Sequence, residues 1–237
     1  MDYIKRGVIR ELSEEEIQEW DGGQNYISHH DVTKPGFRTT KLQIVSNSCL
    51  NNNGKGLSYN DTLLKGPNSL SSLYSALITF HFYECVVVWD LQKAYNAIST
   101  TLVECHYRRM VWRYGDASQD WTTFGFMKMA FGDRPAGFAL EDAKQMVYEA
   151  GKSICPKTAD IMSRGSYVDD SSRGGITEDV DYLIGKVSVD DDGVYSYSGT
   201  VAQILALGGF KPEVMVHSGE KDDQAILKLG YGGFGIP

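Results

Sequence analysis

Carboxylates stand at two places where a buried strand is expected to meet water. Asp90 directly follows the apolar run Cys85-Val86-Val87-Val88-Trp89, and Asp169 and Asp170 end the segment Tyr167-Val168-Asp169-Asp170. A strand buried on both faces does not tolerate an unpaired charge in its interior, so its carboxylate belongs at the end. Mg²⁺ prefers oxygen ligands and keeps coordination sites for substrate phosphates. Carboxylates on two adjacent strands can hold two such ions ~3.5–4 Å apart, which predicts two-metal chemistry on phosphate groups.

Each of these segments also has a purely structural interpretation. Adjacent aspartates are common turn residues, and Asp90 can act as a helix N-cap after the strand. The basic residues between positions 24 and 66 leave a similar choice, because scattered cations usually form a solvated surface but can also line a track for phosphates. These cations are Lys34, Arg38, Lys41, Lys55 and Lys65.

The elements expected to position these residues are a mixture of helices and strands. Helical spacing of apolar residues predicts helices over 3–19, 69–83, 136–150, 178–186 and 199–207. Runs of β-type residues predict strands over 41–45, 85–89, 109–114 and 122–131, with a hairpin around 167–171. This order favours an α+β or mixed-sheet architecture over a doubly wound α/β fold.

The composition is that of a folded globular chain. Of 237 residues, 42% are hydrophobic and 27 are aromatic (14 Tyr, 9 Phe and 4 Trp), which excludes a disordered tail. No apolar run approaches the ~20 residues of a membrane span, and the N-terminus lacks the apolar segment of a secretory signal. The four cysteines lie far apart without a C-x-x-C pair, which indicates a reducing compartment and no zinc site.

The net charge of −8 argues at first against a nucleic-acid partner, but its distribution weakens that argument. Residues 1–22 hold three basic and seven acidic side chains, and residues 178–237 hold four and ten. The stretch 23–177 is left with 16 basic and 14 acidic side chains. A local basic face governs phosphate binding, whereas the mean charge governs solubility, so the central stretch remains a candidate nucleic-acid surface.

Six motifs, in order along the chain, carry a resemblance to a known family. They are 26–35 with 39–42, Gly56–Asp61 with Lys65-Gly66-Pro67, Asp90–Tyr95, Phe131–Phe138, Tyr167–Asp170 and Gly208-Gly209-Phe210. From about residue 3 to about residue 228, the chain resembles the reverse transcriptase domain of LTR retrotransposons and retroviruses, and most closely that of the BEL/Pao group. Tyr167-Val168-Asp169-Asp170 matches the Y-x-D-D motif of that family.

The resemblance implies an α+β fold, a fingers–palm fragment of a right-hand polymerase. Its palm would be an antiparallel sheet with helices packed on one face. The fingers, with an N-terminal helix, would span residues 1–83, and the first carboxylate motif of the palm would span 84–107. Residues 108–131 would return between fingers and palm, and residues 132–237 would form the rest of the palm. The chain would end before a full thumb, as a piece of a longer polyprotein.

The resemblance also implies site residues and their roles. Asp90, Asp169 and Asp170 would be the catalytic carboxylates, and Asp90, Asp169 and the Leu91 carbonyl would bind two Mg²⁺ ions, with Mn²⁺ as the other candidate. Tyr95 would be the steric gate that excludes a 2′-hydroxyl. The remaining nucleotide-binding residues would be Lys34, Arg38, Lys41, Phe131 and Gly132. His29 and His30 match a family pair that we interpret as core residues, since no acid or cysteine lies at ligand spacing.

The function implied is RNA-directed DNA polymerisation, a nucleotidyltransferase reaction. Its partners would be dNTPs, an RNA or DNA template–primer, and the thumb and RNase H parts of a polyprotein, in the cytoplasm or in virus-like particles and without a membrane.

Three departures from the family pattern keep two alternatives open. Gln43 stands where the family has an arginine, Ser46-Asn47 replaces its Phe-Asp, and Val214 replaces a lysine proposed as general acid, for which Lys211 is a weak substitute. A neutral amide side chain cannot replace the bidentate contact of an arginine guanidinium with a triphosphate. The first alternative is therefore a catalytically degenerate domain with a binding or structural role. The second is a viral-type RNA-dependent RNA polymerase, against which Tyr95 argues.

Overall fold

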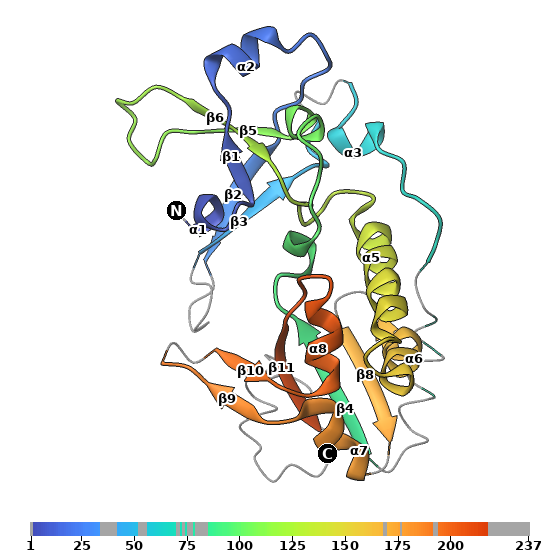
Figure 1. Cartoon of the computed structure of the whole chain (residues 1–237). Coiled ribbons are helices and arrows are strands. Elements are labelled where there is room, and N and C mark those ends of the chain that lie inside the picture. The colour runs from blue at the N-terminus through green and yellow to red at the C-terminus, as the bar shows by residue number, and fades with distance from the viewer. Residues whose placement is uncertain are drawn as a thin grey trace, which may run out of the picture. The chain divides into compact units, whose positions relative to one another are not determined.

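The chain divides into two compact units, and each is built from two separate stretches (Figure 1). The computed structural model describes residues 2–33, 42–51, 56–69, 72, 74, 78, 85–167, 170–175, 177–191 and 194–217. Unit 1 comprises Met1–Pro67 and Tyr95–Ala136, and unit 2 comprises Asn68–Ala94 and Gly137–Pro237. The assignment of segments to fingers and palm stays a prediction.

Unit 1 is a small mixed unit of short helices and antiparallel strands. Its elements are α1 (Asp2–Lys5), β1 (Ile9–Glu11), α2 (Glu14–Glu19), β2 (Ser28–Thr33), β3 (Leu42–Asn47), α3 (Tyr59–Thr62), η2 (Ala94–Ala97), η3 (Glu104–Tyr107), β5 (Arg109–Trp112) and β6 (Thr122–Phe126). The strands form a three-stranded sheet in the order β1-β6-β5 and a separate β2–β3 hairpin. The predicted strands over 109–114 and 122–131 are found, although both are shorter than expected.

The N-terminal segment differs from the helix expected over 3–19. Gly7 has a φ of +64°, a conformation that ends α1, and β1 then pairs with β6 through Ile9 opposite Phe126. Ser13 starts α2 with a reciprocal capping box, in which Glu16 is the partner. The helical spacing of apolar residues was misleading because Val8 and Ile9 are buried against β5 and β6, with Phe124, rather than along one helix face.

Unit 2 is a four-stranded sheet with helices. Its elements are β4 (Cys85–Leu91), α5 (Ala136–Gly151), α6 (Pro156–Gly165), β7 (Ser166–Tyr167), β8 (Asp170–Gly175), α7 (Thr177–Ile184), β9 (Val187–Val189), β10 (Tyr195–Tyr197), α8 (Thr200–Ala206) and β11 (Pro212–His217). The sheet order is β11-β4-β8-β7, and all its pairs are antiparallel. β4 is thus an inner strand, as its continuous apolar sequence predicts, and Trp89 is fully buried.

The helices of unit 2 lie close to their predicted positions. α5, α7 and α8 match the ranges expected from apolar spacing, while α6, which was not predicted, begins after Cys155 with Pro156 in its first turn. α6 contacts β8 and α7 contacts β4, so helices cover the sheet that carries Asp90. The acidic loop around 188–199 contains the short β9–β10 hairpin, which the sequence did not indicate.

Helices and antiparallel sheets together confirm the α+β class. The predicted helix over 69–83 lies almost entirely outside the described residues. Among the helices that are described, none has the length and apolar character needed to cross a bilayer.

Candidate active site

The two carboxylate motifs meet on adjacent strands of the unit 2 sheet. The strands β4 and β8 are antiparallel neighbours (Figure 1). Asp90 lies near the end of β4 and Asp170 begins β8, and the register of the strands places the two residues directly opposite each other. Directly opposite residues of an antiparallel pair belong to the same face of the sheet, with Cα atoms roughly 4.5–5.5 Å apart. Asp169 itself lies outside the described residues, one position before Asp170.

Asp90 is half-buried and held by its own strand end. The backbone N–H of Leu91 donates to its Oδ1 at 2.8 Å, which fixes one carboxylate oxygen while the side chain stays partly accessible. Leu91 is 3% exposed and pairs with Pro212 of β11. Lys211 precedes that proline, and its carbonyl oxygen accepts a hydrogen bond of 2.8 Å from the N–H of Gln92. The end of β4 therefore has Asp170 on one side and the backbone of Lys211 on the other.

The donor set at this sheet end suits a hard cation. Its described members are the Asp90 carboxylate and the backbone carbonyl at position 91, which are oxygen donors of the kind Mg²⁺ prefers, and the strand register places Asp170 opposite Asp90. Among the side chains that the structure describes, no group of three His, Cys, Asp or Glu residues comes together as a metal site. Those of Asp169 and Asp170 are not among them.

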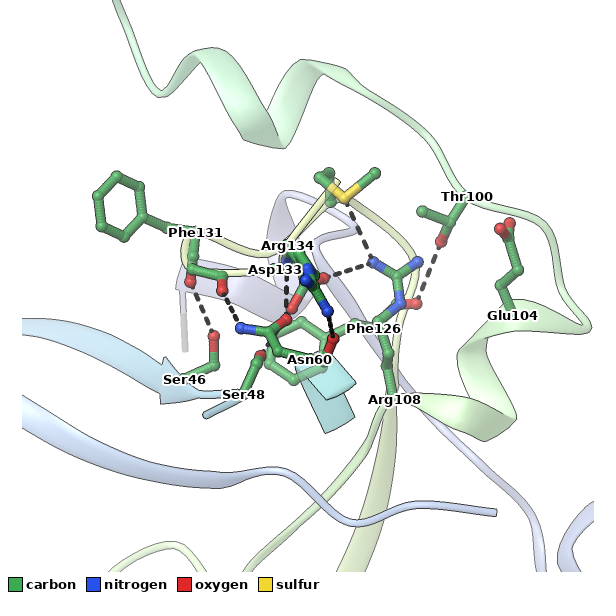
Figure 2. Close-up of polar contacts among 12 residues, drawn as sticks. Ser46, Ser48, Asn60, Thr100, Glu104, Arg108, Phe126, Phe131, Asp133 and Arg134 are labelled. Carbon is green, nitrogen blue, oxygen red and sulfur yellow. Dashed lines mark hydrogen bonds and ion pairs between the residues drawn. The ribbon is translucent and has the colours of Figure 1, made fainter. Parts of the chain in front are cut away.

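A second group of predicted residues lies in unit 1, at the turn from Phe131 to Arg134 (Figure 2). Gly132 adopts a φ of +100°, which side chains with a Cβ rarely adopt, so the turn requires glycine. Asn60 holds both sides of this turn: its Nδ2 donates to the Gly132 carbonyl at 2.9 Å, and its Oδ1 accepts from the Arg134 N–H at 2.7 Å. Ser46 Oγ donates to the Phe131 carbonyl at 3.1 Å.

The side chain of Asp133 anchors the same turn from inside unit 1. Its Oδ1 accepts a 2.7 Å hydrogen bond from Ser48 Oγ, and its Oδ2 lies 3.2 Å from Arg108 Nη1 in an ion pair (Figure 2). The Asp133 and Arg108 side chains are 1% and 4% exposed. Contacts from β3 and the residue after it, from α3, and from Arg108 just before β5 therefore fix the turn.

The aromatic rings of Tyr95 and Phe131 are in contact. Their centroids are 5.5 Å apart with an interplanar angle of 77°, a favourable edge-to-face arrangement. Phe131 is 60% exposed and Tyr95 is half-buried, so both rings can still be reached from solvent. The structure thus brings together three predicted nucleotide-binding residues, Tyr95, Phe131 and Gly132.

Other predicted residues are placed apart from these groups or not described. Lys34, Arg38 and Lys41 lie outside the described residues. His30 is exposed, so its interpretation as a core residue is wrong. His29 is half-buried and packs against the Trp112 ring with a centroid distance of 5.6 Å, and burial is the main reason that the pKa of His29 lies below its ordinary value.

The polar network behind the glycine turn is the part that sequence reasoning missed. Gly56–Asp61 and Phe131–Phe138 both carried the family resemblance, but nothing in their spacing showed that Asn60 bonds the turn of the second motif. Ser58 forms a capping box with Asp61, which shapes α3 and presents Asn60. Burial also raises the pKa of the neighbouring Tyr59 to about 12, so its hydroxyl stays protonated. The signal was the S-x-x-D pattern of a helix start.

The chain resembles known proteins in its fold but not detectably in its sequence. No protein-family model matches the chain, and no curated protein matches its sequence. Among solved structures, a foamy viral protease-reverse transcriptase in complex with an RNA/DNA hybrid matches with a TM-score of 0.58 and 13% identity. The fold is reverse-transcriptase-like. The match covers 90% of this chain but 22% of the viral one, so this chain spans about a fifth of that protein.

Proposed function

We propose that this chain is the fingers–palm part of an RNA-directed DNA polymerase, of the kind found in BEL/Pao retrotransposons. The observation that carries the proposal is the register of β4 and β8, which sets Asp90 opposite the second residue of the Asp169-Asp170 pair. The reverse-transcriptase-like fold supports it. The substrates are a dNTP and a primer 3′-hydroxyl on an RNA or DNA template.

The carboxylates at the end of β4 have distinct tasks in this proposal. Asp90 and Asp169, with the Leu91 carbonyl, would hold two Mg²⁺ ions, and Asp170 would complete the negative charge of the site. The bound ions would supply electrostatic stabilisation of the attacking and leaving oxygens. Asp90 is suited to ligation because the Leu91 N–H orients its carboxylate and the side chain stays partly accessible to solvent.

The Tyr95–Phe131 pair and the Gly132 turn would form the sugar side of the nucleotide site. Tyr95 would exclude a 2′-hydroxyl by shape, and its contact with Phe131 limits how far the ring can move away. The fixed turn would let backbone approach the nucleotide at Gly132, where no Cβ intervenes. Preorganisation of this kind lowers the entropy that is lost when substrate binds.

Cations would neutralise the triphosphate and the leaving group. Lys34, Arg38 and Lys41 would do so from the β2–β3 region, as phosphoryl transfer requires. Lys211 would protonate the pyrophosphate that leaves, as a substitute for the lysine that the family has at position 214. The hydrogen bond from the Gln92 N–H to the Lys211 carbonyl supports this role, because it ties Lys211 to the residue that directly follows β4.

Primer extension tests the proposal directly. Purified chain should extend a DNA primer on an RNA template with dNTPs and Mg²⁺, and Asp90→Asn or Asp169→Asn should lower the rate by at least about 10³-fold, since each removes a negative ligand. Asp142→Asn makes the same chemical change at an exposed position of α5 and should leave the rate unchanged.

Two results would count against the proposal. Extension that survives Asp90→Asn would contradict the two-metal assignment. A folded chain that binds template–primer but never extends it would favour the degenerate domain, for which the amide at Gln43 is the sequence argument. Parallel reactions with rNTPs test the role of Tyr95 as a steric gate. An enzyme with this gate should incorporate dNTPs and exclude rNTPs, whereas a ribonucleotide polymerase would incorporate rNTPs.

A further inference from the structure

A fully buried ion pair lies on α5 in unit 2, and the proposed catalytic mechanism does not use it. Glu141 and Lys144 are one helical turn apart, Lys144 Nζ is 3.0 Å from Glu141 Oε2, and both side chains are 0% exposed. Lys144 Nζ also donates a short hydrogen bond to Ser166 Oγ. The hydroxyl of the buried Tyr148 donates to the same oxygen at 3.3 Å.

Stability alone gives no reason for this pair. Removing two charges from water costs several kcal/mol per ion, and a buried pair of this kind is often no more stabilising than apolar residues of the same volume. Gln145 Nε2 donates to Glu141 Oε1 at 2.9 Å, and Oε2 faces the Lys144 ammonium at 3.0 Å. A fully buried charge pair of this kind therefore calls for an explanation other than folding energy.

The position of Ser166 supplies one. Ser166 is the first residue of β7, where it pairs with Ser171, and the next pair is Tyr167 with Asp170. Only residues 168 and 169 separate β7 from β8, so the side-chain oxygen held by Lys144 sits at the base of the hairpin that carries the aspartates. The same strand β8 aligns Asp170 with Asp90.

We propose that Lys144, held in place by Glu141, is a positioning residue for the hairpin formed by β7 and β8. It fixes Ser166 and thereby the pairing of β7 with β8, the strand whose register sets Asp170 opposite Asp90. This inference rests on the proposed polymerase function. Groups that orient ligands from behind typically change metal affinity or activity by roughly 10–100-fold when removed.

The test uses a variant designed to fold. Glu141→Gln with Lys144→Met removes both charges together, so no unpaired charge is left, and the Gln oxygen can still accept from Gln145. We expect a thermal midpoint close to that of the unsubstituted chain. Mn²⁺ affinity, measured by EPR titration with the metal alone, should fall at least about 10-fold. Hydrogen exchange of the amides in 166–171 should become at least about 10-fold faster.

The same helix provides a matched control. Glu149 and Lys152 form an i,i+3 pair in the same order at the end of α5, but their side chains are 71% and 45% exposed. Glu149→Gln with Lys152→Met should alter neither Mn²⁺ affinity nor exchange in the hairpin. Ser166→Ala, which removes only the acceptor, should reproduce the effect of the Glu141→Gln/Lys144→Met variant on hairpin exchange.

Two outcomes would overturn the inference, and neither depends on polymerase activity. One is a folded Glu141→Gln/Lys144→Met variant whose hairpin exchanges at the original rate. The other is a Ser166→Ala variant whose hairpin is equally unaffected. If the unsubstituted chain neither binds Mn²⁺ nor extends primers, the polymerase proposal fails, and the exchange measurements still decide whether Lys144 positions the hairpin.

Discussion

Each unit buries an ion pair, and the two pairs are built differently. Arg108 and Asp133 in unit 1 are 25 residues apart, and both Asp133 oxygens have donors, from Ser48 and Arg108. Glu141 and Lys144 in unit 2 are three residues apart on one helix, with Lys144 Nζ 3.0 Å from Glu141 Oε2. The first pair joins two segments that are distant in the sequence, whereas the second joins two residues of the same helix. Burial of a charge pair therefore does not by itself reveal whether the pair serves folding or positioning.

Breaking the unit 1 pair should have the largest effect on stability. Asp133→Ala leaves the Arg108 guanidinium buried without its carboxylate, which should lower the free energy of unfolding by about 3–5 kcal/mol. Urea denaturation followed by tryptophan fluorescence measures this loss. Asp142→Ala, at an exposed position, should change it by less than about 0.5 kcal/mol. A loss below about 1 kcal/mol for Asp133→Ala is what a surface ion pair gives. Such a result would contradict the view that the Arg108–Asp133 pair serves folding.

The glycine turn that the unit 1 pair supports should show a smaller effect. At Gly132, an added Cβ meets only the Ser46 carbonyl oxygen, at 3.6 Å, so the cost of Gly132→Ala comes from its φ of +100°. We expect a loss of roughly 1–3 kcal/mol in the free energy of unfolding. Gly137→Ala, on α5 with open space around its Cβ, should be neutral or stabilising by up to about 1 kcal/mol. Equal changes in the free energy of unfolding for Gly132→Ala and Gly137→Ala would show that the backbone at Gly132 is not constrained to a positive φ.

Acidification should lower the stability of unit 1, by less than either of the substitutions above. Burial is the first cause that lowers the pKa of His106, and the nearby Arg109 guanidinium, 2.8 Å from Nδ1, adds to it. Burial likewise lowers the pKa of His29. A lowered pKa in the folded state means that the unfolded chain binds protons first. The stabilisation is therefore complete above the ordinary value of 6.5 and is lost as the pH falls toward the folded pKa.

A pH series of urea midpoints from 8 to 5 measures this dependence. His106→Gln keeps a polar side chain that can accept from Arg109 but cannot titrate, so its midpoints should fall less steeply below pH 6.5 than those of the unsubstituted chain. Identical slopes, or a chain that becomes more stable on acidification, would contradict the assignment of a neutral, buried His106.

Sequence reasoning recovered the elements whose signals are local. The apolar run before Asp90 became the inner strand β4, and the spacing in 136–150 became α5, because in each case burial follows directly from neighbouring residues. The contacts it missed are those formed between distant segments. Asn60 meets the Gly132 turn 72 positions later, and β1 forms only because β6 pairs with it. The metal ligand set remains a prediction, since Asp169 is outside the described residues.

The order of strands in unit 2 has a consequence for synthesis of the chain. β4 emerges from the ribosome early, yet its two neighbours, β8 and β11, begin at Asp170 and Pro212. During that interval the nascent chain carries a run of valines and a tryptophan with no strand on either edge, a pattern prone to intermolecular β-pairing. A fragment that stops before Asp170 should therefore aggregate, and chaperone binding during translation should concentrate on residues 85–91.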